Sequence, residues 1–213
     1  MIDRGRWIMS FGSLLLMIAA ILVFCGLLQR VLDRMYLTDR QALFLIGLML
    51  IGTFLPGVRL GNVVVNIGGA LIPLGVCAYL LVRTDTTAER CRAVVGSFIT
   101  AALIYLLTKL LPSEAEQMWM EPLWLYGLCG GIVAWLIGRS RRASFICGVA
   151  GTLLADTASF CIATLQGYSA QLQLGGGGIA DASIISGVIA VLLCETVGEL
   201  LERLARRNRG ETT

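Results

Sequence analysis

Asp156 and Asp181 are the only charged side chains between Arg142 and Glu195, in about fifty residues of otherwise uncharged, strongly apolar sequence. A carboxylate in a bilayer is costly, and as a rule it faces a protein interior or a water-filled cavity rather than lipid. Two such groups could bind a cation or a proton, or could share one proton and activate a water molecule. We predict that the two aspartates belong to one site.

Neutral oxygen ligands are available in the apolar segment 62–82. Asn62 and Asn66 share a helical face at i,i+4 spacing, just before the pair Gly68-Gly69. Pro73 has no amide hydrogen, so the carbonyl of Gly69, four residues earlier, would lose its helical hydrogen bond. A bond lost beside two glycines predicts a broken helix, or a passive kink, at Gly68-Gly69/Pro73. The candidate ligand-binding set is therefore Asp156, Asp181, Asn66, Asn62, Gly69 and Gly68.

Asp156 lies on a stripe of small and polar residues that includes Gly148, Thr152 and Ala155 at helical spacing. Such a face packs against neighbouring helices in a membrane, so we predict that Asp156 points into the helix bundle. At a rise of about 1.5 Å per residue, the candidate ligands all fall in the outer half of the bilayer.

The chain carries too little charge for a soluble domain of its length. Of its 213 residues, 57% are hydrophobic and 15% are charged, whereas roughly 25% are charged in soluble domains. Too little polar surface remains to cover an aqueous core, so we predict a polytopic membrane protein. Seven apolar windows are long enough to cross a bilayer core about 30 Å thick. They are 7–29, 41–58, 62–82, 93–111, 122–138, 143–165 and 179–201.

The lengths of these windows and their lack of alternating polarity favour helices over strands. The predicted fold is an all-α integral membrane protein, one domain over residues 1–213 with about seven transmembrane helices. Thirteen of the 17 lysine and arginine residues fall on one side of this bundle, partly in the basic tail 202–213. The positive-inside rule therefore places the C-terminus in the cytoplasm and the N-terminus outside, in the plasma (inner) membrane.

Four consecutive glycines, Gly175–Gly178, precede the last window. Each glycine costs a helix about 1 kcal/mol relative to alanine, so the run is not expected to be helical. It is either a flexible surface loop or a re-entrant segment that lines a cavity, where irregular backbone is tolerated.

The sequence predicts no cofactor and no metal centre. It contains no histidine, which is the commonest metal ligand and general base. Its seven cysteines form no C-x-x-C pair and are expected to be small apolar packing residues. The net charge of +3 is explained by the cytoplasmic loops, so the expected partner is the lipid bilayer and not a nucleic acid.

Three stretches resemble a known family in their order and composition. They read Asn-Ile-Gly-Gly-Ala-Leu-Ile-Pro at 66–73, Gly-Thr-Leu-Leu-Ala-Asp at 151–156 and Gly-Gly-Gly-Gly-Ile-Ala-Asp at 175–181. With the run 184–193, they resemble the prokaryotic multipass membrane-protein family catalogued as domain of unknown function 1614, from about Leu32 to Leu193. The resemblance implies a multipass membrane fold and no settled activity. Ala182 is the clearest departure, since a glycine is expected after the aspartate.

Three functions remain open from the sequence. The first is the binding or translocation of a cation, a proton or a small solute at the outer-half site. The second is an intramembrane aspartyl protease with Asp156 and Asp181 as its catalytic pair. It is similar to the presenilin and prepilin-peptidase pattern, except that Ile179-Ala180 separate the glycines from the aspartate. The third is a non-catalytic scaffold or accessory subunit in which both aspartates are structural. The non-enzymatic functions are preferred, and because no inverted repeat is detectable, transport could require a homo-oligomer.

Overall fold

The computed structural model describes residues 26, 29–31, 35, 39–110 and 122–208. The predicted first segment, 7–29, lies almost entirely outside these residues. The chain forms two compact units, Met1–Ile46 and Gly47–Thr213, and the candidate site belongs to the second unit. The elements in chain order are α2 (Asp39–Phe54), β1 (Val58–Leu60), β2 (Val63–Val65), the π-helical turn η1 (Ile67–Leu71), α3 (Ile72–Val82), α4 (Thr87–Leu110), α5 (Pro122–Gly138), α6 (Arg141–Leu165), β3 (Leu172–Leu174), the 3-10 turn η3 (Gly178–Ala180) and α7 (Ala182–Asn208).

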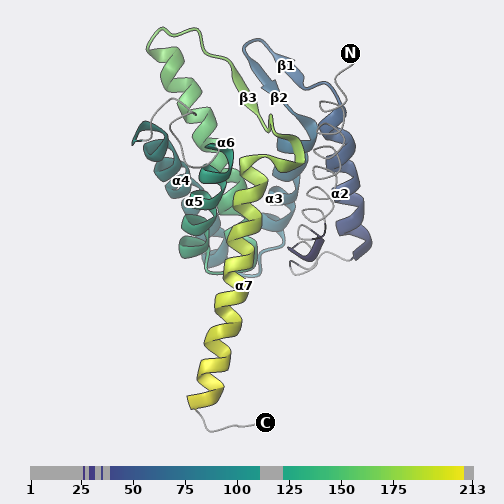
Figure 1. Ribbon diagram of the computed structural model, residues 1–213, viewed down its shortest axis with the longest axis vertical. Coiled ribbons are helices and arrows are strands. Elements are labelled where there is room, and N and C mark those ends of the chain that lie inside the picture. The colour runs from purple at the N-terminus through teal and green to yellow at the C-terminus, as the bar shows by residue number, and fades with distance from the viewer. Residues whose placement is uncertain (1–25, 27–28, 32–34, 36–38, 111–121, 209–213) are drawn as a thin grey trace, which may run out of the picture. The chain divides into compact units, whose positions relative to one another are not determined.

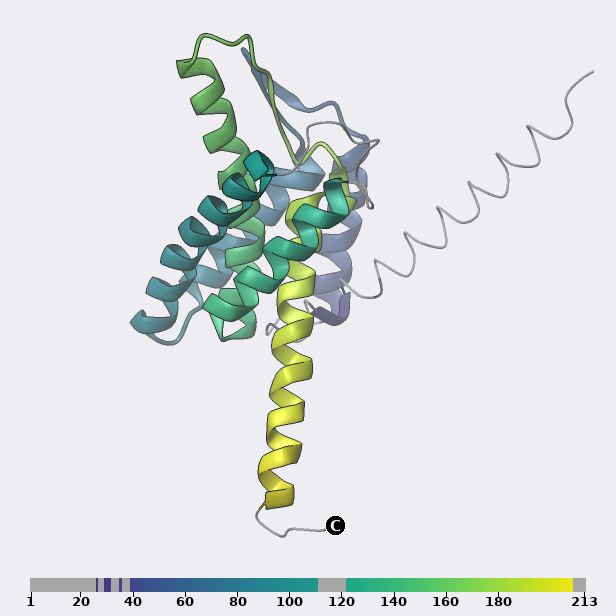
Figure 2. The same ribbon diagram turned by 60° about the vertical axis from the view of Figure 1, so that its left-hand side comes forward.

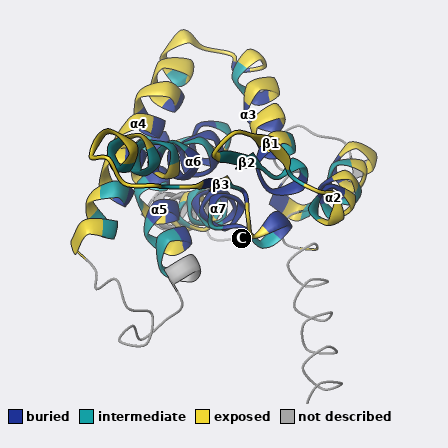
Figure 3. Ribbon diagram, turned by 90° about the horizontal axis from the view of Figure 1, so that it is seen from above, coloured by how far each residue is buried: buried dark blue, intermediate teal, exposed yellow. Residues whose placement is uncertain are grey.

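Helices make up most of the described chain, as predicted. Helices α4, α5, α6 and α7 pack against one another, and α3 packs against α6. Seen from above, α6 and α7 carry much of the buried, dark blue surface, while exposed residues lie on the outer sides of the surrounding helices (Figure 3). A Cβ atom on Gly148 of α6 would lie 2.7 Å from the backbone nitrogen of Gly187 of α7. The two helix backbones are therefore in direct contact, as small residues permit.

The polarity of α4 is the reverse of that expected for a surface helix of a soluble protein. Its buried residues are mostly small or polar: Ala93, Gly96, Ser97, Thr100, Ala101 and Ile104. Its exposed side carries large apolar side chains, among them Phe98 at 61% and Leu106 at 53% exposure. Among the described helices, α4 and α6 are long and apolar enough to cross a membrane. The described part of the chain thus contains two helices that could span a bilayer.

Three short strands form a small sheet that the all-helical prediction did not include. Strands β1 and β2 form an antiparallel hairpin, and β2 pairs in parallel with β3. Figures 1 and 2 show this sheet at one end of the second unit, with the last turns of α7 beyond the opposite end. The predicted helical windows 41–58 and 62–82 are therefore partly wrong. Helix α2 ends at Phe54, ahead of Pro56, and the β-branched run Val63–Val65 is extended.

The predicted break at Gly68-Gly69/Pro73 is not an interruption. Residues Ile67–Leu71 form a π-helical turn that continues directly into α3. The Ile72 N–H donates to the carbonyl of Ile67, five residues earlier, so the helix is wider here than an α-helix. The amide that Pro73 lacks therefore falls where the hydrogen-bond register is already changing, and the helix continues through it.

Candidate functional site

Asp181 is the N-cap residue of α7. Its Oδ2 accepts hydrogen bonds from the Ser183 backbone N–H (3.1 Å) and from the Ser183 hydroxyl (2.7 Å). Its Oδ1 accepts one from the Gly177 N–H (3.1 Å). The residue is buried, with 8% of its surface exposed. Both carboxylate oxygens therefore hold the start of α7 to the end of the glycine run, and a cap of this kind contributes about 1 kcal/mol.

Three segments that are distant in the sequence meet at a cluster of glycines. We call this cluster the glycine junction; its members are Gly52, Gly68, Gly69, Gly175 and Gly178. A Cβ atom on Gly69 would lie 2.2 Å from the carbonyl oxygen of Gly175. A Cβ atom on Gly68 would lie 2.2 Å from the carbonyl oxygen of Met49, in α2. No side chain fits at these distances, so α2, η1 and the glycine run are in backbone contact.

The glycine run is a packed turn. Gly175 and Gly178 are buried and have positive φ angles of 68° and 61°, a conformation that glycine adopts readily and other residues rarely do. The Gly178 N–H donates to the Gly175 carbonyl at 2.9 Å, which closes the turn. This packing favours a fixed segment over a flexible loop, while re-entry into a membrane stays a prediction.

Thr53 connects α2 to the glycine run, and it was not among the predicted site residues. Its hydroxyl donates to the Met49 carbonyl (2.8 Å) and accepts from the Ile179 N–H (3.1 Å). The one signal in the sequence was a polar residue close to the end of the apolar window 41–58. That signal is weak, because such a hydroxyl can bond to its own helix without any partner elsewhere.

The two candidate asparagines have different positions. Asn66 is the N-cap of η1, where its Oδ1 accepts from the Gly69 N–H (2.9 Å). Its own N–H donates to the Leu174 carbonyl in β3 (3.0 Å). Asn62 lies exposed in the turn of the β1–β2 hairpin, and its backbone carbonyl accepts from the Leu172 N–H (2.9 Å). Both residues thus help to attach β3 through their backbones, and the Asn66 side chain also caps η1.

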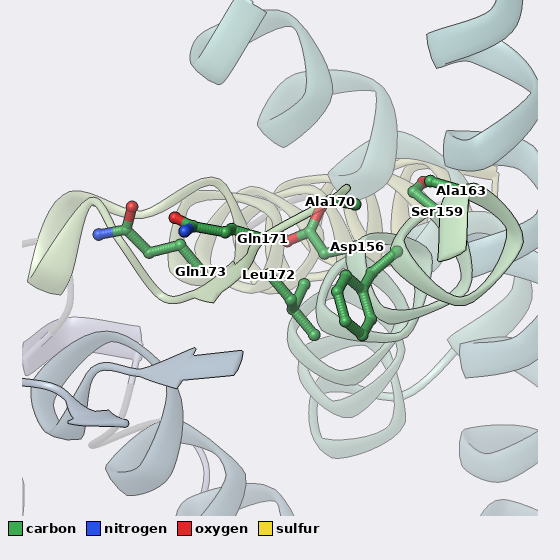
Figure 4. Close-up of a pocket in the computed structure, with 8 residues that line it drawn as sticks. Asp156, Ser159, Ala163, Ala170, Gln171, Leu172 and Gln173 are labelled. Atoms are coloured by element: carbon green, nitrogen blue, oxygen red, sulfur yellow. The ribbon is translucent and has the colours of Figure 1, made fainter. Parts of the chain in front are cut away.

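The Asp156 residue is exposed. Its neighbours on the small-residue stripe, Thr152 and Ala155, are buried, whereas Asp156 is not. The prediction that Asp156 points into the bundle is therefore wrong, because the side chain faces an open pocket of about 380 Å³. Figure 4 shows Asp156 beside Ala170 and Gln171, which belong to the segment leading into β3. Docking of that segment beside α6 creates the pocket.

The remaining groups in this pocket are neutral. Ser159 and Phe160 of α6 and the amides of Gln171 and Gln173 line it together with Asp156. Within the described residues, no hydrogen bond or ion pair holds the Asp156 carboxylate. Nor do the described residues contain a group of three or more cysteine, aspartate and glutamate side chains that could hold a metal ion.

The structure therefore divides the candidate set. Gly68, Gly69 and Asn66 lie at the junction with the glycine run, which Asp181 caps. Asp156 lines the pocket beside β3, and Asn62 lies in the hairpin turn. Joint action of the two aspartates stays a prediction.

Comparison with known sequences identifies a family. The family described as "Protein of unknown function (DUF1614)" matches residues 34–193, which is most of the chain. The chain belongs to this family. No curated protein and no solved structure matches it.

The DUF1614 match includes every member of the glycine junction, both aspartates and the whole pocket beside Asp156. It ends at residue 193, so the later turns of α7 lie outside it. The resemblance predicted from the three stretches is thus confirmed, and these stretches are the ones that the fold brings together around η1 and β3.

Proposed function

We propose that this DUF1614 protein is an integral membrane protein that binds a small cationic solute in the pocket beside Asp156. The observation that carries the proposal is an exposed carboxylate, without a hydrogen-bond or ion-pair partner in the described chain, in a pocket of about 380 Å³. Pockets for small ligands are commonly about 300–1,000 Å³ and contain a few polar groups that fix orientation.

The reversed polarity of α4 supports embedding in a bilayer. Large apolar side chains on its outer face would be costly in water but are at home in lipid. Small and polar residues on its inner face suit helix packing inside a membrane. Exposed apolar side chains also occur on other helices, for example Phe54 at 88% on α2 and Val82 at 77% on α3.

The arrangement of the connections supports the proposed orientation. Arg142, at the start of α6, donates to the Arg83 carbonyl (2.6 Å) and to the Asp85 carboxylate (2.8 Å). The α3–α4 and α5–α6 connections therefore lie at the same end of the bundle. Because both connections are rich in arginine, the positive-inside rule assigns this end to the cytoplasm and the pocket end to the outside.

The chemistry of the pocket favours a monovalent or organic cation. A single carboxylate supplies one negative charge, and amide and hydroxyl oxygens supply neutral ligands. Calcium usually takes six to eight oxygen ligands, several of them from carboxylates, which this pocket does not gather. Phe160 offers an aromatic ring that an ammonium group could approach.

Thermal unfolding of the detergent-purified protein tests the proposal. Sodium, lithium, potassium, calcium and small ammonium compounds would be titrated against the wild type, Asp156→Asn and Asp181→Asn. A ligand that binds only the folded state stabilises it by about 2.7 kcal/mol at 100 times its dissociation constant. We expect a cationic ligand to stabilise the wild type and Asp181→Asn but not Asp156→Asn. A wild type that responds to none of these cations would count against the binding function.

A structural role for Asp181 favours a second candidate, a non-catalytic scaffold. Its hydrogen bonds to Ser183 and Gly177 are those of a helix cap, and the glycine junction needs no ligand to explain it. The same bonds favour the protease less, because an active dyad requires a carboxylate that is available to water. If the protein is a scaffold, none of the cations should change its thermal stability, and Asp156→Asn should be as stable as the wild type.

A further inference from the structure

Another open pocket lies between α5 and α7, at the end of the bundle where α5 terminates. Its volume is about 410 Å³. Trp135, Leu136 and Arg139 line it from α5 and the residue after that helix, and Cys194, Val197 and Gly198 line it from α7. A cationic group, an indole ring and apolar side chains thus converge on one space.

The charged side chain that lines this pocket is positive. Among the described residues of the lining, Arg139 alone carries a charge, and it is exposed. A cationic group in an otherwise uncharged lining suits an anion.

The backbone of Arg139 is held in an unfavourable conformation. Its φ is 56°, in the left-handed region where a helix usually ends in glycine. Glycine at this position would remove the strain but also the only cationic side chain that lines the pocket in the described chain. An arginine here is thus better explained by its charge than by the turn that it forms.

The apolar wall indicates what kind of anion fits. Trp135 lies one helical turn before Arg139, and tryptophan and arginine together are typical of the membrane–water interface. Leu136 is 58% exposed, which is costly beside water and favourable beside an acyl chain. Basic pockets between helices on the cytoplasmic side are suited to acidic lipid headgroups.

We propose that this pocket binds one anionic phospholipid of the cytoplasmic leaflet. Its phosphate would lie at Arg139 and an acyl chain would lie along Leu136 and Val197. The assignment rests on the proposed embedding in a membrane, and it does not depend on the pocket beside Asp156. Free phosphate shares the headgroup chemistry but lacks the chain that the apolar wall would hold.

Fluorescence quenching in vesicles tests this site. Trp135 becomes the reporter in a protein whose Trp7, Trp119 and Trp124 are replaced by phenylalanine. The protein is reconstituted in phosphatidylcholine that contains an equal mole fraction of either brominated phosphatidylglycerol or brominated phosphatidylcholine. We expect the anionic lipid to bind about five-fold more strongly than the zwitterionic one, the factor for one arginine near anionic lipid.

Two variants and a matched control separate the site from general lipid contact. Arg139→Gln should remove the preference for the anionic lipid. A Cβ atom on Gly198 meets no other atom within 4 Å, so Gly198→Leu should fold and fill the pocket, which lowers quenching by the anionic lipid. Gly75→Leu, on α3 and equally unobstructed, should leave the preference unchanged.

Each unfavourable result has a distinct meaning. Equal quenching by the two lipids, in the wild type and all variants, would overturn the lipid site while leaving membrane embedding intact. Absence of quenching by either lipid would overturn the membrane proposal and the site with it. Competition by added inorganic phosphate would show that a free anion is the ligand and would overturn the lipid assignment.

Discussion

Replacement of Gly69 by alanine tests the backbone contact at the centre of the fold. The new Cβ atom would lie 2.2 Å from the Gly175 carbonyl oxygen and 2.7 Å from that of Gly178. Ordinary van der Waals contacts begin near 3.4 Å, so the glycine run would have to move by roughly 1 Å. Overpacking of this kind costs about 1–3 kcal/mol, and alanine recovers about 1 kcal/mol of helix propensity.

We therefore expect Gly69→Ala to lower the free energy of unfolding by about 1 kcal/mol, the overpacking cost less the gain in helix propensity. For a chain of this size, that corresponds to a decrease in Tm of about 2–4 °C. The assay is thermal unfolding of the purified protein in one detergent, followed by circular dichroism.

Gly75→Ala is the matched control, because Gly75 lies in α3 and a Cβ atom added there would meet no other atom within 4 Å. The same chemical change there should raise stability by about 1 kcal/mol, through helix propensity alone. If Gly69→Ala were as stable as Gly75→Ala, the backbones of η1 and the glycine run would not be in contact, and our account of the junction would be refuted.

Substitutions at three further positions test the bonds around the junction and at the end of the bundle where α6 begins. Thr53→Val should lower the free energy of unfolding by about 1–3 kcal/mol, because the Ile179 N–H loses its acceptor. Thr53→Ser keeps a hydroxyl and should retain most of the stability, so equal losses in the two variants would argue against this bond. Asp181→Ala should lower the free energy of unfolding, measured by chemical denaturation, by about 1–2 kcal/mol. Asp181→Asn should lower it less, because asparagine also caps helices. A greater loss with asparagine than with alanine would contradict the capping role. Asp85→Asn should change stability by less than about 1 kcal/mol, and only at low salt, because Asp85 is 75% exposed in its ion pair with Arg142; a large, salt-independent loss would contradict this.

The helices that the sequence predicted best are the long apolar ones. Windows 93–111 and 143–165 nearly coincide with α4 (Thr87–Leu110) and α6 (Arg141–Leu165). An uninterrupted apolar run of this length can satisfy its backbone hydrogen bonds within itself only as a helix. The same reasoning failed at Val63–Val65, because a short β-branched run is equally apolar as a strand, and its hydrogen-bond partners in β1 and β3 lie outside the window.

The candidate site was predicted in composition but not in arrangement. The local pattern Asp-Ala-Ser at 181–183 determines the cap of α7, since the bonds to Ser183 span two residues. The bond from Ile179 to Thr53 spans 126 residues, and no local pattern could have indicated it.

The sequence by itself determined an apolar helical chain with two isolated carboxylates, because charge and hydropathy are properties of the residues alone. Only the tertiary structure decided that Asp156 faces a pocket and that the glycine run packs against η1 and α2. The reason is that β3 docks beside η1 and α6, through bonds from Asn66 to Leu174 and from Leu172 to Asn62. That docking brings the glycines into contact and leaves the Asp156 carboxylate facing the pocket.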